Sequence, residues 1–485
     1  MTLELAPSCA MTNDSTYGDV KRYVIDSTGL AYYLDKDVEF SSHVGRRMAA
    51  LGIADCSAYL NLLHDVSAGE AEHDALTECL TIGETFFFRH QEVFDMIRDQ
   101  VLPELIERNR QHKRLRIWSA GCANGAEPYT LSILLRRDFG EQLAGWDVTI
   151  LGTDINRDSL AQCQRGEFGN WAFRSASHDL QRSCFTQSDQ IWTIKDEYRR
   201  GVLFQYHNLA QHQFPSLIDG LSAFDLILCR NVMIYFNPAI VPRLVAQLYN
   251  CLVDSGWLAV GPTETSVSLF RAFQAINSAG AVLYRKGPQA ALPPGWSPLS
   301  TTVPVVDSPV AGKAAPRDAA AMLARCATEI AASKRYARAP QRDRTSQRPA
   351  YSLPATLADV RAKLNCGDSE AAAEGCRMLL AAERLNPLVH FYHALVAEQQ
   401  GHQAETEAAL RRSIYLDRNG VLAHYHFGLV LQRKGDRQAA ERSLQNVLAL
   451  LHGRDESDVF PDADGLTIGA LRQLTKMHLE ILNRT

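Results

Sequence analysis

Several features are missing from this sequence of 485 residues, and each absence narrows the class of protein. No run approaches the ~18 apolar residues that a transmembrane helix needs, so we expect no membrane insertion. The N-terminus, MTLELAPSC, lacks the basic region followed by an apolar one that is typical of a secretory signal. The 11 cysteines form no C-x-x-C pair, which argues against a zinc site or a disulfide framework. We therefore expect a cytoplasmic protein with free thiols and no bound metal.

An excess of positive charge is also missing. The chain has 50 Lys and Arg residues against 55 Asp and Glu, a net charge of −5 with neutral histidines. A protein whose affinity depends on phosphate contacts is normally basic, so we expect no nucleic-acid partner. The length is sufficient for more than one domain with a core of its own.

The sequence that is present is organised around residues 115–134, LRIWSAGCANGAEPYTLSIL. An apolar run predicts a buried parallel strand, which breaks at Gly121 and Gly125 and continues as a helix that Pro128 can open. A strand, a glycine turn and a helix present backbone N–H groups to a nucleotide-like ligand in a doubly wound sheet. The spacing is looser than G-x-G-x-x-G, so the turn alone also fits an ordinary strand-to-helix connection.

A second strand favours the ligand-binding interpretation. Residues 148–151 lead into Gly152-Thr153-Asp154, which places a carboxylate where it can accept both hydroxyls of a ribose. Glu127 supplies a second acceptor beside the glycine turn. Two carboxylates suit a cationic, amine-bearing ligand better than a chain of phosphates, and this points to S-adenosylmethionine.

The clearest buried strand in the chain is residues 224–229, FDLILC. It ends at Arg230 and Asn231, with Tyr235 shortly after. Because the carboxyl ends of strands line the ligand crevice of an open α/β sheet, these polar residues are candidates for the chemistry. The alternative for Tyr235 is a buried structural tyrosine.

Two other stretches are open to more than one interpretation. Arg46-Arg47 lie on a predicted helix in an acidic region and form either a solvated face or a docking point. Residues 86–88 are three phenylalanines followed by Arg89. They are either a hydrophobic connector, with Arg89 in a salt bridge, or part of the site.

The pattern of helices, strands and prolines predicts five regions. Residues 1–20 are a flexible N-terminus, residues 21–90 a small helical domain, and residues 91–286 an α/β domain with a helix at 92–108 and a small β insertion at about 165–206. A linker rich in proline and arginine, with one expected helix at about 319–337, covers residues 287–353. An all-helical domain covers residues 354–485.

The last region contains a repeat. Gly367, Gly401 and Gly435 are each 34 residues apart, and small or apolar positions such as Ala394 and Gly428 recur at the same offset. A helix–turn–helix period of 34 residues is typical of tetratricopeptide repeats, which bind partners and carry no chemistry of their own. We expect residues 466–482 to form a terminal capping helix.

Five segments occur in an order that resembles a known family: ETFFFR (84–89), SAGCANGAEPYTLSI (119–133), GTDIN (152–156), HNL (207–209) and FDLILCRNVMIYF (224–236). Over about residues 20–286 the chain is similar to the CheR-type chemotaxis receptor methyltransferases. Its repeats are similar to those of members with a C-terminal tetratricopeptide domain. The resemblance implies an α/β fold with a Rossmann-like methyltransferase domain, a small N-terminal helical domain and an all-α C-terminal domain.

The same resemblance implies an activity. The protein would transfer a methyl group from S-adenosylmethionine to glutamate side chains on the cytoplasmic coiled-coil helices of a chemoreceptor, leaving S-adenosylhomocysteine as product. The repeats would bind a partner that the sequence does not identify. A glutamate is already ionised at neutral pH, with an ordinary pKa of about 4.3, so the reaction needs alignment rather than a general base.

The resemblance also assigns roles to residues. Arg89 and Tyr235 would face the transferable methyl group as the catalytic pair. Thr85 and Arg89 would contact the methionine part of the cofactor, Glu127 its amino group and Asp154 the ribose. Position 83, usually Asn in the family, is Gly83 here, so that side-chain contact is absent. The implied cofactor-binding set is Gly83, Thr85, Arg89, Glu127, Asp154, Asn208, Leu209, Arg230 and Asn231, with Asn208, Leu209 and Asn231 on the adenine side.

Two alternatives remain beside this hypothesis. One is a scaffold in which the repeats act and the cofactor site is a relic. The other is a methyltransferase for a different carboxylate or a small molecule.

Overall fold

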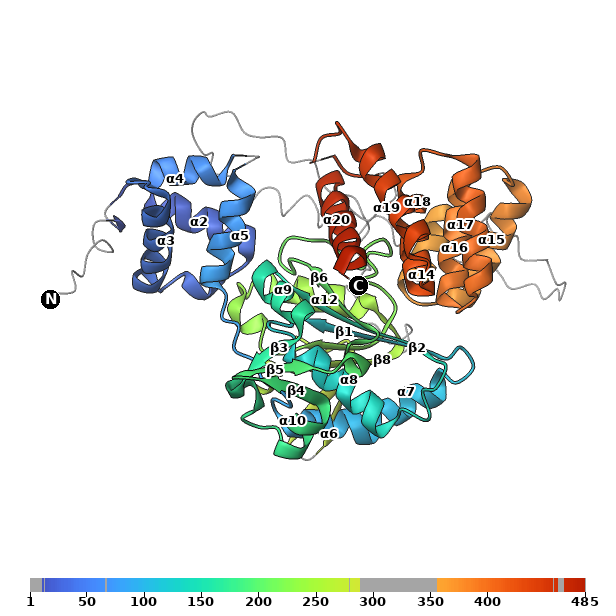
Figure 1. Cartoon of the computed structure of the whole chain (residues 1–485), viewed down its shortest axis with the longest axis horizontal. Helices are drawn as coiled ribbons and strands as arrows, with labels where there is room; N and C mark the ends of the chain where they lie inside the picture. Colours follow the sequence, from blue (N-terminus) through green and yellow to red (C-terminus); the bar gives the residue numbers. More distant parts are fainter. Residues whose placement is uncertain are drawn as a thin grey trace, which may run out of the picture. The chain divides into compact units, whose positions relative to one another are not determined.

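The computed structural model describes residues 11–12, 14–65, 68–278, 280–287, 356–456, 458–460 and 466–484. In chain order these residues form a group of helices, an α/β region and a second group of helices (Figure 1). Within the described residues, no helix is long and apolar enough to cross a membrane. The predicted linker, with its expected helix at 319–337, lies almost entirely outside the described residues.

The N-terminal helices close around an apolar core. Val20 and Phe40 are completely buried in it. The expectation that residues 1–20 are a loose end is wrong for their last part, because the first of these helices begins at Tyr17 and the Asp14 carboxylate accepts a hydrogen bond from the Cys56 N–H at 3.0 Å. Residues 1–10 lie outside the described residues. The helices are α2 (Tyr17–Thr28), α3 (Asp37–Leu51), α4 (Cys56–Leu63) and α5 (Gly69–Leu80).

The two adjacent arginines of α3 have different surroundings. Arg47 forms an ion pair of 2.5 Å with the buried Glu72, which also accepts a hydrogen bond from Tyr59. Arg46 is exposed, and its hydrogen-bond partner among the described residues is the ring of His43, at 2.8 Å. Arg47 therefore stabilises the helical core. For Arg46 both predicted roles still apply, a solvated helix face or a docking point.

A seven-stranded sheet forms the centre of the α/β region, in the order β6-β2-β1-β7-β8-β10-β9. The first five strands in that order are parallel to one another. The apolar runs of the sequence predict such a buried parallel sheet. The last two strands are antiparallel, β10 to β8 and β9 to β10. After β1 the chain adds β2 and β6 on one side of it, and then β7 and β8 on the other side. The direction in which strands are added therefore reverses between β1 and β7. Ligands of open α/β sheets bind at such a switch point. The strands are β1 (Arg114–Ala120), β2 (Asp147–Asp154), β6 (Val202–Tyr206), β7 (Phe224–Cys229), β8 (Leu252–Val260), β9 (Phe273–Ser278) and β10 (Ala281–Lys286).

The small β insertion exists but ends earlier than expected. A separate three-stranded antiparallel sheet contains β3 (Glu167–Gly169), β5 (Ile191–Ile194) and β4 (Phe185–Ser188). The expected limit at residue 206 is wrong, because β6 pairs in parallel with β2 from Val202 to Tyr206 and so belongs to the main sheet.

Helices pack on the sheet and lead into it. The expected helix at 92–108 is one continuous segment, made of α6 (Gln91–Met96), a π-helical turn (Ile97–Val101) and α7 (Leu102–Arg108). Phe87, in the connector before it, is completely buried and stacks on Phe173 with ring centroids 5.1 Å apart. The other helices of the region are α8 (Ala126–Asp138), α9 (Arg157–Arg165), α10 (His178–Cys184), α11 (Asp196–Arg199) and α12 (Val241–Cys251).

The C-terminal helices follow the 34-residue spacing. Gly367, Gly401 and Gly435 each lie in the turn between two helices, with φ values of 78°, 76° and 84°. A left-handed backbone at a helix end favours glycine, which explains the repeat. Assignment to the tetratricopeptide family stays a prediction. The helices are α14 (Leu357–Asn365), α15 (Ser369–Ala382), α16 (Pro387–Gln399), α17 (Gln403–Leu416), α18 (Val421–Lys434), α19 (Arg437–Leu451) and α20 (Ile468–Arg484), the last near the expected capping helix.

The small residue at position 428 allows α18 and α19 to approach each other. A Cβ atom on Gly428 would lie 2.8 Å from the side chain of the fully buried Leu444. We expect Gly428→Val to lower the free energy of unfolding of the C-terminal helices by about 1–3 kcal/mol through overpacking. Urea unfolding followed by circular dichroism measures this change. Ala404→Val, at an exposed position of α17, is the control and should cost only about 0.5 kcal/mol; equal losses in both variants would contradict the packing argument.

Candidate functional site

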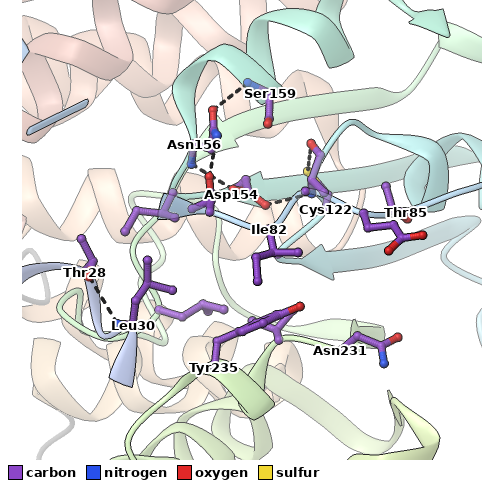
Figure 2. Close-up of a pocket in the computed structure, with 18 of the residues that line it drawn as sticks. Thr28, Leu30, Ile82, Thr85, Cys122, Asp154, Asn156, Ser159, Asn231 and Tyr235 are labelled. Atoms are coloured by element: carbon purple, nitrogen blue, oxygen red, sulfur yellow. Dashed lines mark hydrogen bonds between the residues drawn. The ribbon is translucent and has the colours of Figure 1, made fainter. Parts of the chain in front are cut away.

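A cavity opens at the carboxyl ends of β1, β2, β6 and β7, at the switch point of the sheet. Figure 2 shows Asp154 and Asn156 on one side of this cavity and Tyr235 and Asn231 on the other. The structure brings together every site residue predicted from the sequence, because all of them line this one cavity: Gly83, Thr85, Arg89, Glu127, Asp154, Asn208, Leu209, Arg230, Asn231 and Tyr235.

The glycine turn after β1 wraps around the Asp154 carboxylate. Gly121 and Gly125 have φ values of 77° and 86°, in the left-handed region that glycine adopts at little cost. The Ala123 N–H donates to Asp154 Oδ2 at 2.8 Å, and the Asn156 N–H donates to Oδ1 at 2.9 Å. Burial raises the pKa of Asp154, and these backbone donors oppose that rise. Each carboxylate oxygen keeps a lone pair for a ligand.

Glu127 is held from two sides. Its Oε1 accepts a hydrogen bond from Ser119 Oγ, and its Oε2 lies 2.7 Å from Arg230 Nη1. It stands at the start of α8, which begins at Ala126, so Pro128 is inside the first turn rather than its opening residue. The carboxylate is therefore oriented before any ligand arrives.

Arg230 is a buried residue that holds neighbouring parts of the site in place. Its side chain is only 2% exposed. Besides pairing with Glu127, the guanidinium donates to the Arg89 carbonyl oxygen and lies 2.9 Å from His90 Nδ1. Burial and the neighbouring Arg230 cation lower the pKa of His90, which favours a neutral ring. Arg230 thus fixes Glu127 and the Arg89 backbone instead of offering a free cation to the cavity.

Arg89 keeps its charge available. Its Nη1 donates to the Glu84 carbonyl oxygen at 2.6 Å, and its guanidinium lies 5.8 Å from the ring centroid of Phe86. Among the described residues no carboxylate is within ion-pair distance of Arg89, so the expected alternative of a salt bridge is not seen there. The cation is half-buried at the cavity wall.

Tyr235 contributes a hydroxyl group to the cavity. Its ring meets Tyr32 edge-on, with centroids 5.7 Å apart. Burial raises the pKa of Tyr235, so the hydroxyl is protonated at neutral pH and can donate a hydrogen bond. In the part of the chain that the structure describes, this hydroxyl has no hydrogen-bond partner.

The Asn208 side chain is already engaged. Its Nδ2 donates to the Ser27 carbonyl oxygen at 2.8 Å, and its Oδ1 accepts from the Ala210 N–H at 2.9 Å. Leu209 is buried beside it. These two residues therefore shape the cavity wall, and the Asn208 amide joins the N-terminal helices to the end of β6.

The thiols near the cavity are inert. Burial raises the pKa of both Cys122 and Cys229 well above the ordinary thiol value, so both stay protonated. A thiol is a poor nucleophile compared with its thiolate. Among the described residues, no group of His, Cys, Asp and Glu side chains is arranged to hold a metal ion.

Sequence reasoning missed three contributors to the site. Part of the cavity wall comes from the N-terminal region, namely Thr28, Leu30, Tyr32 and Tyr33. Asn156, inside the GTDIN segment, donates to Thr81 Oγ1 at 2.7 Å and caps α9 through the Ser159 N–H. Glu264 binds the loop after β7 through backbone N–H groups. The sequence signal for the last is incomplete, because Glu264 stands three residues after Gly261 and accepts from its N–H, while a full capping box would also need a Ser or Thr side chain at position 261.

Gly83 stands at the cavity with free space around it. A Cβ atom there would have no heavy atom within 4 Å, and its backbone is not left-handed. A side chain could therefore be introduced at this position without strain.

Comparison with known proteins gives consistent results. Residues 83–282 match the family model "CheR methyltransferase, SAM binding domain". The "Chemotaxis protein methyltransferase 1" of Pseudomonas aeruginosa is 30% identical over 263 residues, which cover 53% of this chain and 92% of that protein. The "Chemotaxis protein methyltransferase" of Borreliella burgdorferi is 29% identical over 247 residues, 50% of this chain and 86% of that protein.

Solved structures match at a low level of similarity. The magnesium protoporphyrin IX methyltransferase from Synechocystis PCC 6803 with bound SAH matches 47% of this chain and 93% of its own. The TM-score is 0.24 and the identity 14%.

Proposed function

Because this chain belongs to the CheR family of chemotaxis protein methyltransferases, and so carries a SAM-binding domain, we propose that it esterifies glutamate side chains of a chemoreceptor. Relatives named as chemotaxis methyltransferases support a receptor as substrate. The observation that carries the proposal is the single cavity in which Arg89, Asp154 and Tyr235 meet at the carboxyl ends of the strands. The proposed substrate segment is a cytoplasmic coiled-coil helix.

The cavity fits S-adenosylmethionine. Asp154 keeps a lone pair on each oxygen, which suits the two hydroxyls of a ribose. Glu127, fixed by Ser119 and Arg230, is an acceptor for the ammonium group. We assign Thr85, Gly83 and Asn231 to the remaining walls of the cofactor site, with Asn208 and Leu209 on the adenine side.

When bound, S-adenosylmethionine would supply an electrophilic methyl group on its sulfonium, which a carboxylate oxygen could accept while the sulfur left with the C–S electron pair as a neutral thioether. The chain's own residues orient the incoming carboxylate. Arg89 attracts it, because no carboxylate of the described residues already neutralises that guanidinium. Tyr235 donates a hydrogen bond to one carboxylate oxygen and leaves the other free to attack. The acceptor is already ionised, so no residue needs to remove a proton.

The decisive experiment offers purified protein, SAM with a labelled methyl group and receptor cytoplasmic fragments. The expected result is label on receptor glutamates that is released by mild base, as a carboxyl ester requires. Label that resists base would contradict ester formation. Cofactor binding without label on any carboxylate would favour the scaffold alternative, and peptide mapping identifies the modified glutamates.

Removing one hydroxyl tests the role of Tyr235. We expect Tyr235→Phe to lower kcat about 10- to 10²-fold with little change in the KM for SAM, because one hydrogen bond to the charged substrate carboxylate is worth about 1.5–3 kcal/mol. Initial rates of methyl transfer measure both constants. Tyr415→Phe, on an exposed C-terminal tyrosine, is the control. An unchanged kcat in Tyr235→Phe would place the hydroxyl outside the reaction.

The C-terminal helices have a separate proposed role. We infer that their repeated pairs present a surface to a protein partner, as stacked helix pairs commonly do.

A further inference from the structure

Glu264 is buried behind the cavity and has an unusual set of partners. It follows β8 in the segment Gly261-Pro262-Thr263-Glu264 and is 8% exposed. Among the described residues it has no cation within ion-pair distance. Its charge is instead surrounded by backbone N–H groups.

These donors come from the loop that carries the proposed substrate-facing residues. Oε2 accepts from the Asn231 N–H at 2.7 Å and Oε1 from the Val232 and Met233 N–H groups at 2.8 Å each. Oε2 also accepts from the Gly261 N–H at 2.7 Å. Hydrogen bonds to an ionised acceptor are roughly twice as strong as neutral ones, so one side chain fixes the backbone of this loop.

The loop needs such a fixed point. Asn231 has a φ of 59°, a left-handed conformation that a residue other than glycine adopts only when its surroundings require it. The conformation aligns successive N–H groups toward one carboxylate. It also leads into the short 3-10 helix Met233–Tyr235, whose last residue lines the cavity.

The opposite side of the loop packs on the glycine turn. A Cβ atom on Gly121 would lie 2.4 Å from Val232 Cγ2, so Val232 sits directly against the cofactor-binding turn. A shift of the loop would therefore displace the cofactor side and the Tyr235 side together.

We propose that Glu264 is the positioning residue for methyl transfer, holding residues 231–235 in the geometry that places Asn231 at the cofactor and Tyr235 at the incoming carboxylate. It acts through the backbone of these residues and does not contact the substrate. This inference deepens the proposed function and rests on it for its kinetic consequence.

The chemistry of the side chain makes the proposal testable with an isosteric change. Glu264→Gln keeps the shape but replaces one acceptor oxygen by an NH₂ group that faces backbone donors. We expect kcat/KM for methyl transfer to fall about 10²-fold, the order caused by a misplacement of roughly 1 Å. Both a higher KM for SAM and a lower kcat should contribute, because Asn231 and Tyr235 move together.

A second measurement is independent of catalysis. Hydrogen exchange of the amides of residues 231–234 should become at least about tenfold faster in Glu264→Gln, while exchange in β1 stays unchanged. Affinity for S-adenosylhomocysteine should fall in parallel. The matched control is Glu104→Gln on α7, which breaks the 2.6 Å pair with Arg285 and should alter none of these values.

Each outcome decides the question. Wild-type kinetics in folded Glu264→Gln, or a lower thermal stability with unchanged loop exchange, would overturn the proposal. If the Gln variant does not fold, Glu264→Asp keeps the charge with a shorter reach and should be folded, slow and faster-exchanging at 231–234. Unfolding of both variants would make Glu264 a purely structural residue. Failure of the wild-type protein to methylate receptors would refute the proposed function but leave the exchange and affinity tests valid.

Discussion

Asp154→Ala should weaken the binding of S-adenosylhomocysteine about 10²- to 10⁴-fold. The carboxylate is expected to accept two ribose hydroxyls, and hydrogen bonds to a charged acceptor contribute about 1.5–3 kcal/mol each. The substitution also removes the acceptor for the Ala123 N–H, which shapes the glycine turn. Isothermal titration calorimetry with the demethylated product measures the affinity without any receptor.

The matched control for this variant is Asp179→Ala on α10, whose carboxylate is 91% exposed. It should bind the product with wild-type affinity. A folded Asp154→Ala protein that also retains wild-type affinity would remove the ribose assignment and, with it, the orientation of the cofactor proposed for this cavity.

Arg230→Met should lower the free energy of unfolding by about 3–5 kcal/mol, because breaking one side of a buried ion pair leaves a charge without compensation. The pair with Glu127 spans 2.7 Å, and the two side chains are 2% and 13% exposed. The guanidinium also supports the Arg89 carbonyl oxygen. Urea unfolding at pH 7 measures the loss.

A double variant separates the ion pair from packing. Arg230→Met combined with Glu127→Gln should recover part of the lost stability, since no unpaired carboxylate remains. If the double variant is as unstable as the sum of both single changes, the two groups are not coupled and the pair does not organise the site.

The strands of the central sheet were predictable because their signal is local. Residues 224–229 form an uninterrupted apolar run, and all six residues of β7 are buried. The end of the β insertion was not predictable in the same way. β6 is short and Leu203 is 44% exposed, so only its pairing with β2 shows that it belongs to the main sheet.

The same distinction applies to the site. Asp154 is the last residue of β2, and Arg230 and Tyr235 follow β7, so their positions at strand ends are visible in the sequence. Glu264 and Asn156 act through hydrogen bonds to backbone or side-chain atoms of segments distant in the chain, as in the 2.7 Å contact between Glu264 and Asn231. No local pattern identifies the far partner of such a bond. Asn208 is predicted to contact the cofactor, but its side-chain amide donates a hydrogen bond to the Ser27 carbonyl oxygen, a distant partner that the sequence does not reveal.

The three left-handed glycines at 367, 401 and 435 have a consequence for how this chain can evolve. Each turn is formed by residues of its own 34-residue unit. Duplicating or deleting one whole unit therefore leaves the residues that form the neighbouring turns unchanged. The C-terminal region can therefore lengthen or shorten in steps of one helix pair, changing the surface that it offers to the proposed partner while the α/β region is preserved.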